Sequence, residues 1–384
     1  MTPVLAGVRI VEQGTFITGP CAGMMLADLG ADVIKIESPT GDPYRSYQGG
    51  QLSPHFQAYN RNKRSVALDL ARDADRALFD RLIVEADVYI QNFRPGTADR
   101  LGAGTPRLQE LNPRLVYCSI SGFGSTGPYA DRPSYDSVAQ ALSGFLSVVV
   151  DPERPRFLGP ALADAITGIY AAYGVLGALF ERSRTGRGRR VEVSMLEAMA
   201  HFSVEPFAAL FALGQVPRSS DRPRLAQAYI LRTADGGLLA IHLSSLEKFW
   251  DGLVRALESD QLRADPRFAT RQARIDNYEA LNAALDQLFA RRPMEEWVER
   301  LGRCDVPFAP IHRVDEVVAD PQVSHLDLIV PVRGAHGGTQ AVRPAVQFDG
   351  ERATHVRGAP LLDEHGPAIR HALAGAGRWP ALAD

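Results

Sequence analysis

The stretch that decides the fold is "VRIVEQGTFITGPCAGMMLADLGADVIKIE", residues 8–37. Two apolar runs of strand length flank a helical pattern, with Pro20 at the start of the helix and Gly30 just after its end. Strand, helix and strand of these lengths form a βαβ unit, whose two strands run parallel. The N-terminal part of the chain therefore predicts a parallel sheet.

The same alternation continues along the chain. Strands are expected at 65–70 ("SVALDL"), 87–93 ("DVYIQNF") and 114–121 ("RLVYCSIS"), with a helix at 73–86. We therefore expect an α/β fold built on a Rossmann-like large domain. The longest helix is predicted at 160–184, ended by "TGRGRR", followed by a strand at 190–195 and one helix over 196–213.

Residues 214–226, "GQVPRSSDRPRLA", are polar, contain two prolines and lack periodic apolar positions. This composition is typical of a linker, so the N-terminal part of the large domain is predicted at 1–213. A hairpin around Asp235, Gly236 and Gly237 then opens a second domain, in which amphipathic helices run to about Leu301. A final helix is expected near 366–374.

Composition excludes several classes of protein. The 42 Lys and Arg residues nearly balance 45 Asp and Glu residues in a chain of 384, and the net charge of −3 favours neither nucleic acid nor an anionic membrane surface. No signal peptide is recognisable, and no apolar run approaches the ~18 residues of a membrane span. Cys21, Cys118 and Cys304 are too far apart to predict a disulfide framework or a zinc site. We expect a cytoplasmic protein without a metal.

Common cofactor motifs are also missing. Gly14 and Gly19 lie too far apart for G-x-G-x-x-G, so Glu37, at the end of the second strand, is only a weak candidate for binding the ribose of NAD. Neither a P-loop nor the G-x-S-x-G of serine hydrolases occurs. A nicotinamide-dependent dehydrogenase stays a minor alternative, separable by measuring NAD binding.

Two basic clusters flank the ends of predicted strands. They are "NRNKRS" (60–65) and "NFRPGTADR" (92–100). Lys63, Arg64, Arg94 and Arg100 could neutralise phosphates, because guanidinium groups chelate phosphate oxygens. Each could equally belong to a structural ion pair. The convergence of four cations favours an anionic ligand.

Asp164 stands at the start of the apolar helix in "GPALADAITGIYAAYG", residues 159–174. A carboxylate in the first turn of a helix can simply cap backbone N–H groups. Alternatively, a carboxylate held in an apolar pocket can attack an electrophile as a covalent nucleophile. The residues around it do not decide between the two.

Long segments of the chain resemble the class III CoA-transferases, a family that includes formyl-CoA transferase, carnitine CoA-transferase and the α-methylacyl-CoA racemases. They are "GPCAGMMLADLGADVIKIE", "NRNKRSVALDL", "ADVYIQNFRPGTADRLG", "LNPRLVYCSISGFGSTGPYADRPSYDSVAQALSG", "GPALADAITGIYAAYGVLGAL" and "TGRGRRVEVSMLEA". The resemblance implies an acyl-CoA and a small carboxylic acid as substrates, with CoA transferred between them.

Asp164 matches the catalytic aspartate of this family. The resemblance implies that it attacks the thioester carbonyl to form an anhydride and then an aspartyl-CoA thioester. This chemistry needs a carboxylate ionised at neutral pH, which a helix N-terminus favours, and a cavity that excludes water.

The resemblance also implies which residues contact CoA. They are Ile17, Thr18, Leu68 to Ala71, Asn92, Phe93, Arg94, Arg100 and Tyr135. Arg94 and Arg100 are the expected phosphate partners, whereas Lys63 and Arg64 match no CoA contact. Ser38 replaces a basic residue of formyl-CoA transferase, and 214–226 lacks the glycine-rich substrate loop of that enzyme, so we expect an acid other than oxalate or formate.

Three alternatives stay open beside CoA transfer. Racemases of the family carry histidine where Tyr135 stands, and a phenol is a poor base at pH 7, so transfer is favoured over racemisation. Lyase-like members are harder to separate. A non-catalytic acyl-CoA-binding module is a third alternative, which predicts that Asp164→Asn changes nothing.

The family also implies an assembly. Both chain ends should build the large domain, with a small α+β domain at 227–310 inserted through linkers and the chain returning to the large domain over 311–384. Two protomers are expected to interlock as a homodimer that has no stable monomer.

Overall fold

The computed structural model describes residues 3–157, 159–244, 246–334, 336, 338–375 and 378–381. The outermost residues of the predicted domain ranges, 1–2 and 382–384, lie outside it. The chain divides into two compact units. Unit 1 is formed by Met1–Leu146, Phe157–Val204 and Gln322–Asp384, and unit 2 by Ser147–Arg156 and Glu205–Pro321.

A six-stranded parallel sheet organises unit 1, with the strand order β3-β2-β1-β4-β5-β6. The strands are β1 (Arg9–Gln13), β2 (Asp32–Glu37), β3 (Arg64–Ala67), β4 (Val88–Gln91), β5 (Val116–Ser121) and β6 (Arg190–Ser194). This is the strand order of the doubly wound nucleotide-binding fold. All its strands are parallel, and the direction in which successive strands are added to the sheet reverses between β1 and β4. The predicted parallel α/β architecture is confirmed.

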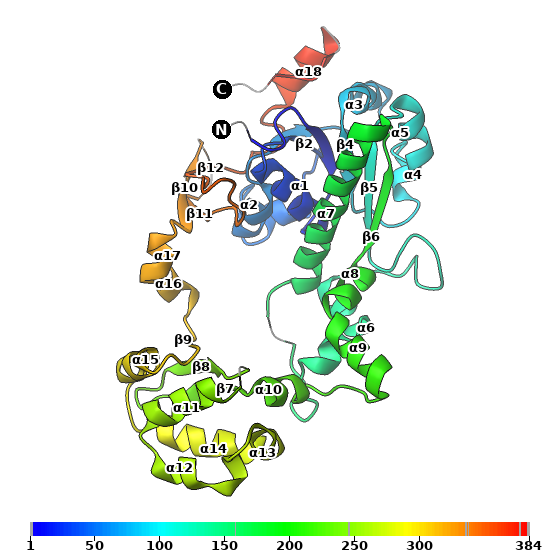
Figure 1. Cartoon of the computed structure of the whole chain (residues 1–384). Helices are drawn as coiled ribbons and strands as arrows, with labels where there is room; N and C mark the ends of the chain where they lie inside the picture. The colour runs from blue at the N-terminus through cyan, green and yellow to red at the C-terminus, as the bar shows by residue number, and fades with distance from the viewer. Residues whose placement is uncertain are drawn as a thin grey trace. The chain divides into compact units, whose positions relative to one another are not determined.

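Helices cover both faces of this sheet. On one face, α1 (Thr18–Asp28) and α7 (Leu162–Thr185) lie side by side over a core that includes Ile10, Val33 and Val88 (Figure 1). On the other face, α3 (Asp73–Glu85), α5 (Thr105–Leu111) and α18 (Gly366–Ala374) bury Phe79, Leu108 and Ile369. Because both faces are covered, the strands are rich in apolar residues, although they also contain the buried charged residues Glu12, Lys35 and Arg64.

Shorter elements complete unit 1. They are η1 (Pro43–Ser46), α2 (Pro54–Asn60), α4 (Thr97–Arg100), α6 (Asp136–Leu142), α8 (Met195–Phe202), β10 (Ile329–Arg333), β11 (Gln340–Val342) and β12 (Val356–Arg357). The elements η2 (Phe145–Val148), α9 (Val204–Leu213) and α17 (Pro321–His325) extend across the unit boundaries.

The chain ends α7 as predicted but interrupts the next helix. Gly186 takes a left-handed conformation (φ 71°) after α7, and its N–H donates to the carbonyl of Arg182. The prediction of one helix over 196–213 is wrong, because α8 ends at Phe202 and α9 begins at Val204. Pro206 has no N–H to donate to the carbonyl of Phe202, which explains the break.

Unit 2 contains a small antiparallel sheet, β7 (Ala228–Arg232), β8 (Leu238–His242) and β9 (Phe308–Pro310). The predicted hairpin is confirmed, with Gly236 at φ 85° in its turn. The other elements are α10 (Asp221–Ala226), α11 (Leu246–Leu257), α12 (Asp260–Ala264), η3 (Pro266–Phe268), α13 (Arg271–Asp276), α14 (Tyr278–Phe289), α15 (Met294–Arg303) and α16 (Val314–Val317). A core around Trp250, Leu285 and Trp297 joins helices and sheet.

The edge strand β3 is closed by the C-terminal part of the chain. The N–H of Ala67 donates to Asp363 Oδ1 at 2.8 Å, and the N–H of Ser65 donates to His365 Nδ1 at 3.3 Å. These side chains occupy donors that an open edge would offer to another strand. The last segment of the chain therefore completes the first sheet.

The helices α1 and α7 approach closely at Gly168. A Cβ atom at this position would lie 2.7 Å from Cys21 Cβ and 3.0 Å from the carbonyl oxygen of Thr18.

By length and composition α7 is the one continuous helix of the described residues that could cross a bilayer, with the pair α8 and α9 passing the same test only if counted as one span. In unit 1 it packs on the sheet and on α1.

We expect Gly168→Ala to lower the free energy of unfolding by about 1–3 kcal/mol, because the added methyl group pushes α7 away from α1. Gly177→Ala on the same helix is the matched control, since nothing lies within 4 Å of its added Cβ. That change should stabilise by about 0.5–1 kcal/mol through helix propensity. Thermal unfolding of both variants tests the pair, and equal effects would contradict the close contact.

Candidate active site

A cavity of about 580 Å³ lies at the carboxyl ends of the central strands of the sheet. Its walls come from the loops after β1, β4 and β5 and from the first turn of α7. It brings together seven of the predicted site residues, namely Ile17, Thr18, Asn92, Phe93, Arg94, Tyr135 and Asp164. Ligands of doubly wound folds bind at this edge, near the point where the strand order reverses.

The other predicted residues lie around this cavity. Leu68 lines a neighbouring cavity of about 360 Å³, which shares Phe93 and Thr15 with the first one. Arg100 lies in α4, where its guanidinium donates to Thr97 Oγ1 at 2.8 Å. Ala71 follows β3 in a turn, its N–H donating to Asp69 Oδ1. Neither Ala71 nor Arg100 is among the residues that line these two cavities.

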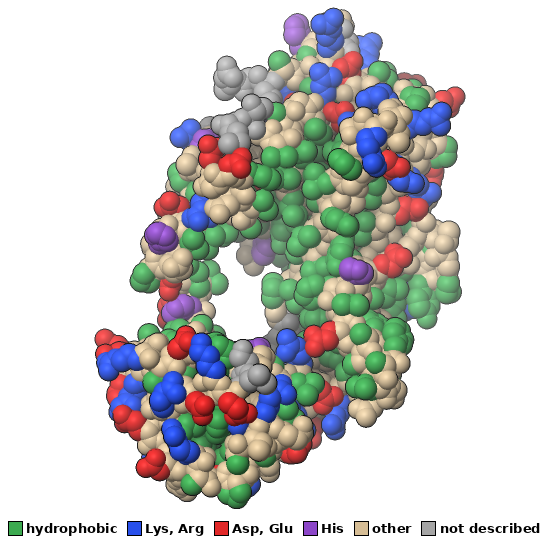
Figure 2. Space-filling view, in the orientation of Figure 1, with side chains coloured by type: hydrophobic (Ala, Val, Ile, Leu, Met, Phe, Trp, Pro, Cys, Tyr) green, Lys and Arg blue, Asp and Glu red, His purple; other side chains and the backbone are tan. Residues whose placement is uncertain are grey.

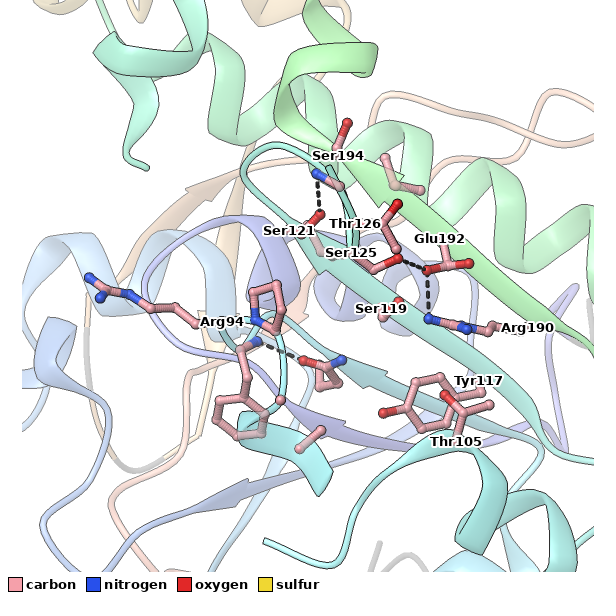
Figure 3. Close-up of a pocket in the computed structure, with 18 of the residues that line it drawn as sticks. Arg94, Thr105, Tyr117, Ser119, Ser121, Ser125, Thr126, Arg190, Glu192 and Ser194 are labelled. Carbon is pink, nitrogen blue, oxygen red and sulfur yellow. Dashed lines mark hydrogen bonds and ion pairs between the residues drawn. The ribbon is translucent and has the colours of Figure 1, made fainter. Parts of the chain in front are cut away.

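A third cavity, of about 600 Å³, adjoins the Asp164 cavity and shares Phe93, Arg94 and Ile120 with it. Its lining is rich in hydroxyl groups from β5, β6 and the loop between Ser121 and Thr126 (Figure 3). Glu192 accepts hydrogen bonds from Ser125 Oγ at 2.9 Å and from Arg190 at 2.6 Å, while Arg94 extends away from this pair.

The loop after β1 is fixed by side chains from three other segments. Asn92 accepts the N–H of Thr15 at 2.9 Å and donates to Thr15 O and Thr18 Oγ1, both at 2.8 Å. Asp42 Oδ1 accepts the N–H of Phe16, which stands in a left-handed conformation at φ 59°. Lys35 donates to Gly14 O at 2.6 Å. This wall of the Asp164 cavity is therefore preorganised.

The cations of the first basic cluster serve this scaffold. Lys63 is buried and ion-paired with Glu12, and it also donates to the carbonyl of Pro20 at 2.8 Å. Arg64 forms a two-point ion pair with Asp32, with distances of 3.0 and 2.6 Å. The interpretation of Lys63 and Arg64 as phosphate ligands is therefore wrong. Their burial against carboxylates leaves no donor exposed to a ligand.

Glu37 has a structural partner too. Its carboxylate accepts two hydrogen bonds of 2.7 Å from Arg45 and one of 2.6 Å from Ser65. It is only 4% exposed, so it is not available to bind a ribose. This arrangement removes the remaining support from the sequence for NAD.

Asp164 does not cap its helix. The N–H groups of Ala163 and Asp164 donate to Asp136 Oδ1, at 2.7 and 3.2 Å, so that Asp136 on α6 caps α7. The interpretation of Asp164 as a capping residue is therefore wrong. Its carboxylate is left facing the cavity. Asp136 was missed because it lies 27 positions before Ala163 and 28 before Asp164, beyond any local capping pattern.

Burial raises the pKa of Asp164 to about 7, and the negative charge of Asp136 adds to the rise. The sequence predicts a carboxylate that is ionised at neutral pH, and this raised pKa opposes its ionisation there. Burial outweighs the favourable field of the helix N-terminus here. The ionised form is poorly solvated, which is the condition under which a carboxylate is a strong nucleophile.

Aromatic rings shelter this carboxylate. Phe16 contacts Tyr135 edge-to-face at 6.2 Å between ring centroids and Tyr44 at 5.5 Å, and all three line the cavity. Phe16 and Tyr44 are partly buried and Tyr135 is 61% exposed, so this wall limits the access of water only in part. Among the residues that the structure describes, no group of three or more His, Cys, Asp or Glu side chains is placed to bind a metal ion.

Comparisons with known proteins agree with this site. Residues 5–366 match the sequence model of CoA-transferase family III. The chain is 34% identical to the acetyl-CoA:oxalate CoA-transferase of Acetobacter aceti, over 96% of this chain and 95% of that protein. It is 34% identical to the succinate–glutarate CoA-transferase of Agrobacterium fabrum, over 94% of each. A CaiB/BaiF family protein from Brucella suis superposes with a TM-score of 0.87 at 35% identity, covering 97% of this chain and 100% of that one.

We expect Asp164→Asn to be more stable than the wild type at pH 8. The folded-state pKa of about 7 lies above the ordinary aspartate value of 3.8, so the folded wild type binds more protons than the unfolded chain and loses stability as pH rises between these values. The amide has no charge to bury. The difference in unfolding temperature between Asp164→Asn and the wild type should vanish below pH 4 and reach a plateau above pH 7. A difference independent of pH would contradict the raised pKa.

Proposed function

Because the chain belongs to CoA-transferase family III, we propose that it moves CoA from an acyl-CoA thioester to a carboxylic acid through covalent intermediates on Asp164. The observation that carries this proposal is the Asp164 carboxylate, which lines a sheltered cavity and is not used as a helix cap.

The proposed reaction has two matched halves. The ionised carboxylate of Asp164 attacks the donor thioester carbonyl, the CoA thiolate leaves, and an acyl–aspartyl anhydride forms. The thiolate then attacks the aspartyl carbonyl, which releases the donor acid and leaves an aspartyl-CoA thioester. The acceptor carboxylate attacks this thioester and expels the thiolate, and the thiolate attacks the acceptor carbonyl. Acyl-CoA forms, Asp164 is regenerated, and the energy of the thioester is conserved.

For CoA we propose a path along the sheet edge. Ile17, Thr18, Asn92 and Phe93 would contact the pantetheine arm, since they line the cavity of Asp164. The cavity at Leu68 would hold the nucleotide end, near Ala71, because Phe93 joins the two cavities. Arg94 and Arg100 would pair with phosphates.

The names of the relatives do not select one acid as the substrate of this chain. The relatives named above act on oxalate in one case and on succinate and glutarate in the other, at the same identity to this chain. We propose a short carboxylic acid as acceptor and no metal. The three unbridged cysteines support our proposal of a reducing cytoplasm.

Racemisation or lyase chemistry is the second candidate function. A carboxyl group with a pKa of about 7 suits general acid–base catalysis as well as nucleophilic attack. Racemisation needs a second base opposite Asp164, and Tyr135, which lines the cavity, stands at the position where racemases of the family carry histidine. Transfer is therefore the better supported reaction.

We also propose a homodimer. The large apolar side chains of Ile169, Tyr173 and Phe180 on α7 and Phe202 on α8 are exposed, Tyr173 by 73%. Figure 2 shows hydrophobic side chains gathered over this part of the surface. Patches of this kind mark protein interfaces, and the resemblance to the family adds that two protomers interlock.

We expect Asp164→Ala to abolish CoA exchange between an acyl-CoA and a carboxylic acid. Hydroxylamine added during turnover should trap a hydroxamate at position 164 of the wild type, found by peptide mass analysis. Asp73→Ala removes a first-turn aspartate from α3 and is the matched control, which should keep full activity. Exchange by the alanine variant at the wild-type rate would refute the proposal, and α-proton exchange in D₂O without an adduct would favour racemisation.

The dimer should be the only species in sedimentation velocity runs from high nanomolar to micromolar concentrations. Tyr173→Asp is expected to lower the dimer fraction or the yield of folded protein, because it places a charge on the proposed interface. Arg255→Gln, at an exposed position of α11 in unit 2, should change neither. A monodisperse wild-type monomer would contradict this arrangement.

A further inference from the structure

We propose that Arg132 makes the acceptor site selective for dicarboxylic acids by pairing with the carboxylate that does not react. This inference rests on the proposed CoA transfer and names the substrate class of the same cavity. Arg132 belongs to the loop between β5 and α6. The family resemblance assigns the part of this loop around Tyr135 to CoA, so Arg132 stands beside the expected CoA contacts.

Arg132 is held in place without using its hydrogen-bond donors. Its guanidinium carbon lies 4.5 Å from the centre of the Tyr129 ring, and its backbone N–H donates to the carbonyl of Tyr129 at 3.0 Å. Stacking engages the face of a guanidinium and leaves its N–H edges free for a carboxylate. Within the described part of the chain, no carboxylate pairs with it.

The charges that line the cavities favour an anion here. The Asp164 cavity has one carboxylate, Asp164 itself, against the guanidinium groups of Arg94 and Arg132. The adjoining cavity of about 600 Å³ shares Arg94 but also contains Asp99, Glu192 and Glu197, with Arg190 already paired to Glu192. A dicarboxylate would be repelled there and attracted to the Asp164 cavity.

The same loop supplies an unused hydroxyl group. Ser134 Oγ lines the Asp164 cavity, is buried, and has no hydrogen-bond partner. The backbone around it is tightly packed, since a Cβ at Gly122 would lie 2.3 Å from Ser134 Cβ. A buried hydroxyl without a partner is costly, and a ligand carboxylate would satisfy it.

Arg132 and Arg94 have separable tasks. The resemblance assigns Arg94 to CoA, which is common to every reaction of the enzyme. Arg132 remains for the acid. A monocarboxylic acceptor has only the group that attacks the aspartyl-CoA thioester, whereas a dicarboxylic acceptor keeps a second charge that needs a cation.

The test compares glutarate with pentanoate, which has the same carbon chain and one carboxylate, as acceptors for wild type, Arg132→Gln and Arg132→Lys. We expect Arg132→Gln to raise the KM for glutarate about 10- to 100-fold, the cost of losing one charged hydrogen-bond pair, with no change for pentanoate. Arg132→Lys should recover part of the loss. The KM for the acyl-CoA donor should stay constant in each.

Arg184→Gln is the matched control, because Arg184 also stacks on an aromatic ring, that of Phe180 at 5.0 Å, but lies near the C-terminal end of α7. Arg184→Gln should change the KM for neither glutarate nor pentanoate. Arg94→Gln should raise the donor KM with every acceptor. Equal effects of Arg132→Gln on glutarate and pentanoate, or a raised donor KM, would overturn the proposal and make Arg132 a CoA ligand.

Calorimetric binding of glutarate to the CoA-loaded protein separates this inference from the proposed chemistry. If Arg132→Gln weakens glutarate binding and hydroxylamine traps no adduct at Asp164 during turnover, the covalent mechanism is refuted and the selectivity is retained. If an adduct is trapped at Asp164 and Arg132→Gln leaves glutarate binding unaffected, the covalent mechanism is retained and the selectivity is refuted.

Discussion

The buried ammonium group of Lys35 between two carboxylates is the constraint on which the active site depends. It pairs with Glu12 at 3.0 Å and with Asp42 at 3.1 Å, and all three side chains are inaccessible to water. Burying ions costs free energy that their attraction barely offsets, so the network is better explained by what it positions. Lys35 and Asp42 fix Gly14 and Phe16, and so the loop that forms one wall of the Asp164 cavity. Removing the charge of Lys35 would leave the buried carboxylate of Asp42 without this cation beneath that loop.

The carboxylate of Asp164, which we propose as the nucleophile, is maintained at a cost to the fold. A first-turn aspartate would ordinarily stabilise α7, but Asp136 takes the capping role and its charge lies close enough to disfavour ionisation of Asp164. The division of roles between two carboxylates leaves one bonded and one available for chemistry. Residues that violate a local stability rule in this way concentrate at functional sites.

The sequence predicts the sheet well because its strands are nearly continuous apolar runs, which period and length distinguish from the intervening helices. It also predicts the end of α7, where Gly186 supplies the left-handed residue. Prediction fails where the role of a side chain depends on partners that are distant in the sequence. Lys63 and Arg64 look like ligands for phosphate until Glu12 and Asp32 are seen beside them, and Asp136 has no sequence pattern linking it to α7. Unpaired cations such as Arg132 become visible only when every other partner is known.

The closure of β3 by Asp363 and His365 has a consequence for synthesis on the ribosome. The polypeptide emerges from its N-terminus, so nearly three hundred residues separate Ala67 from the side chain that accepts its N–H. Until residue 363 has been synthesised and has left the ribosome, this margin of the sheet stays open to other nascent chains. Translation that stops before residue 363 would therefore damage a strand that was made much earlier.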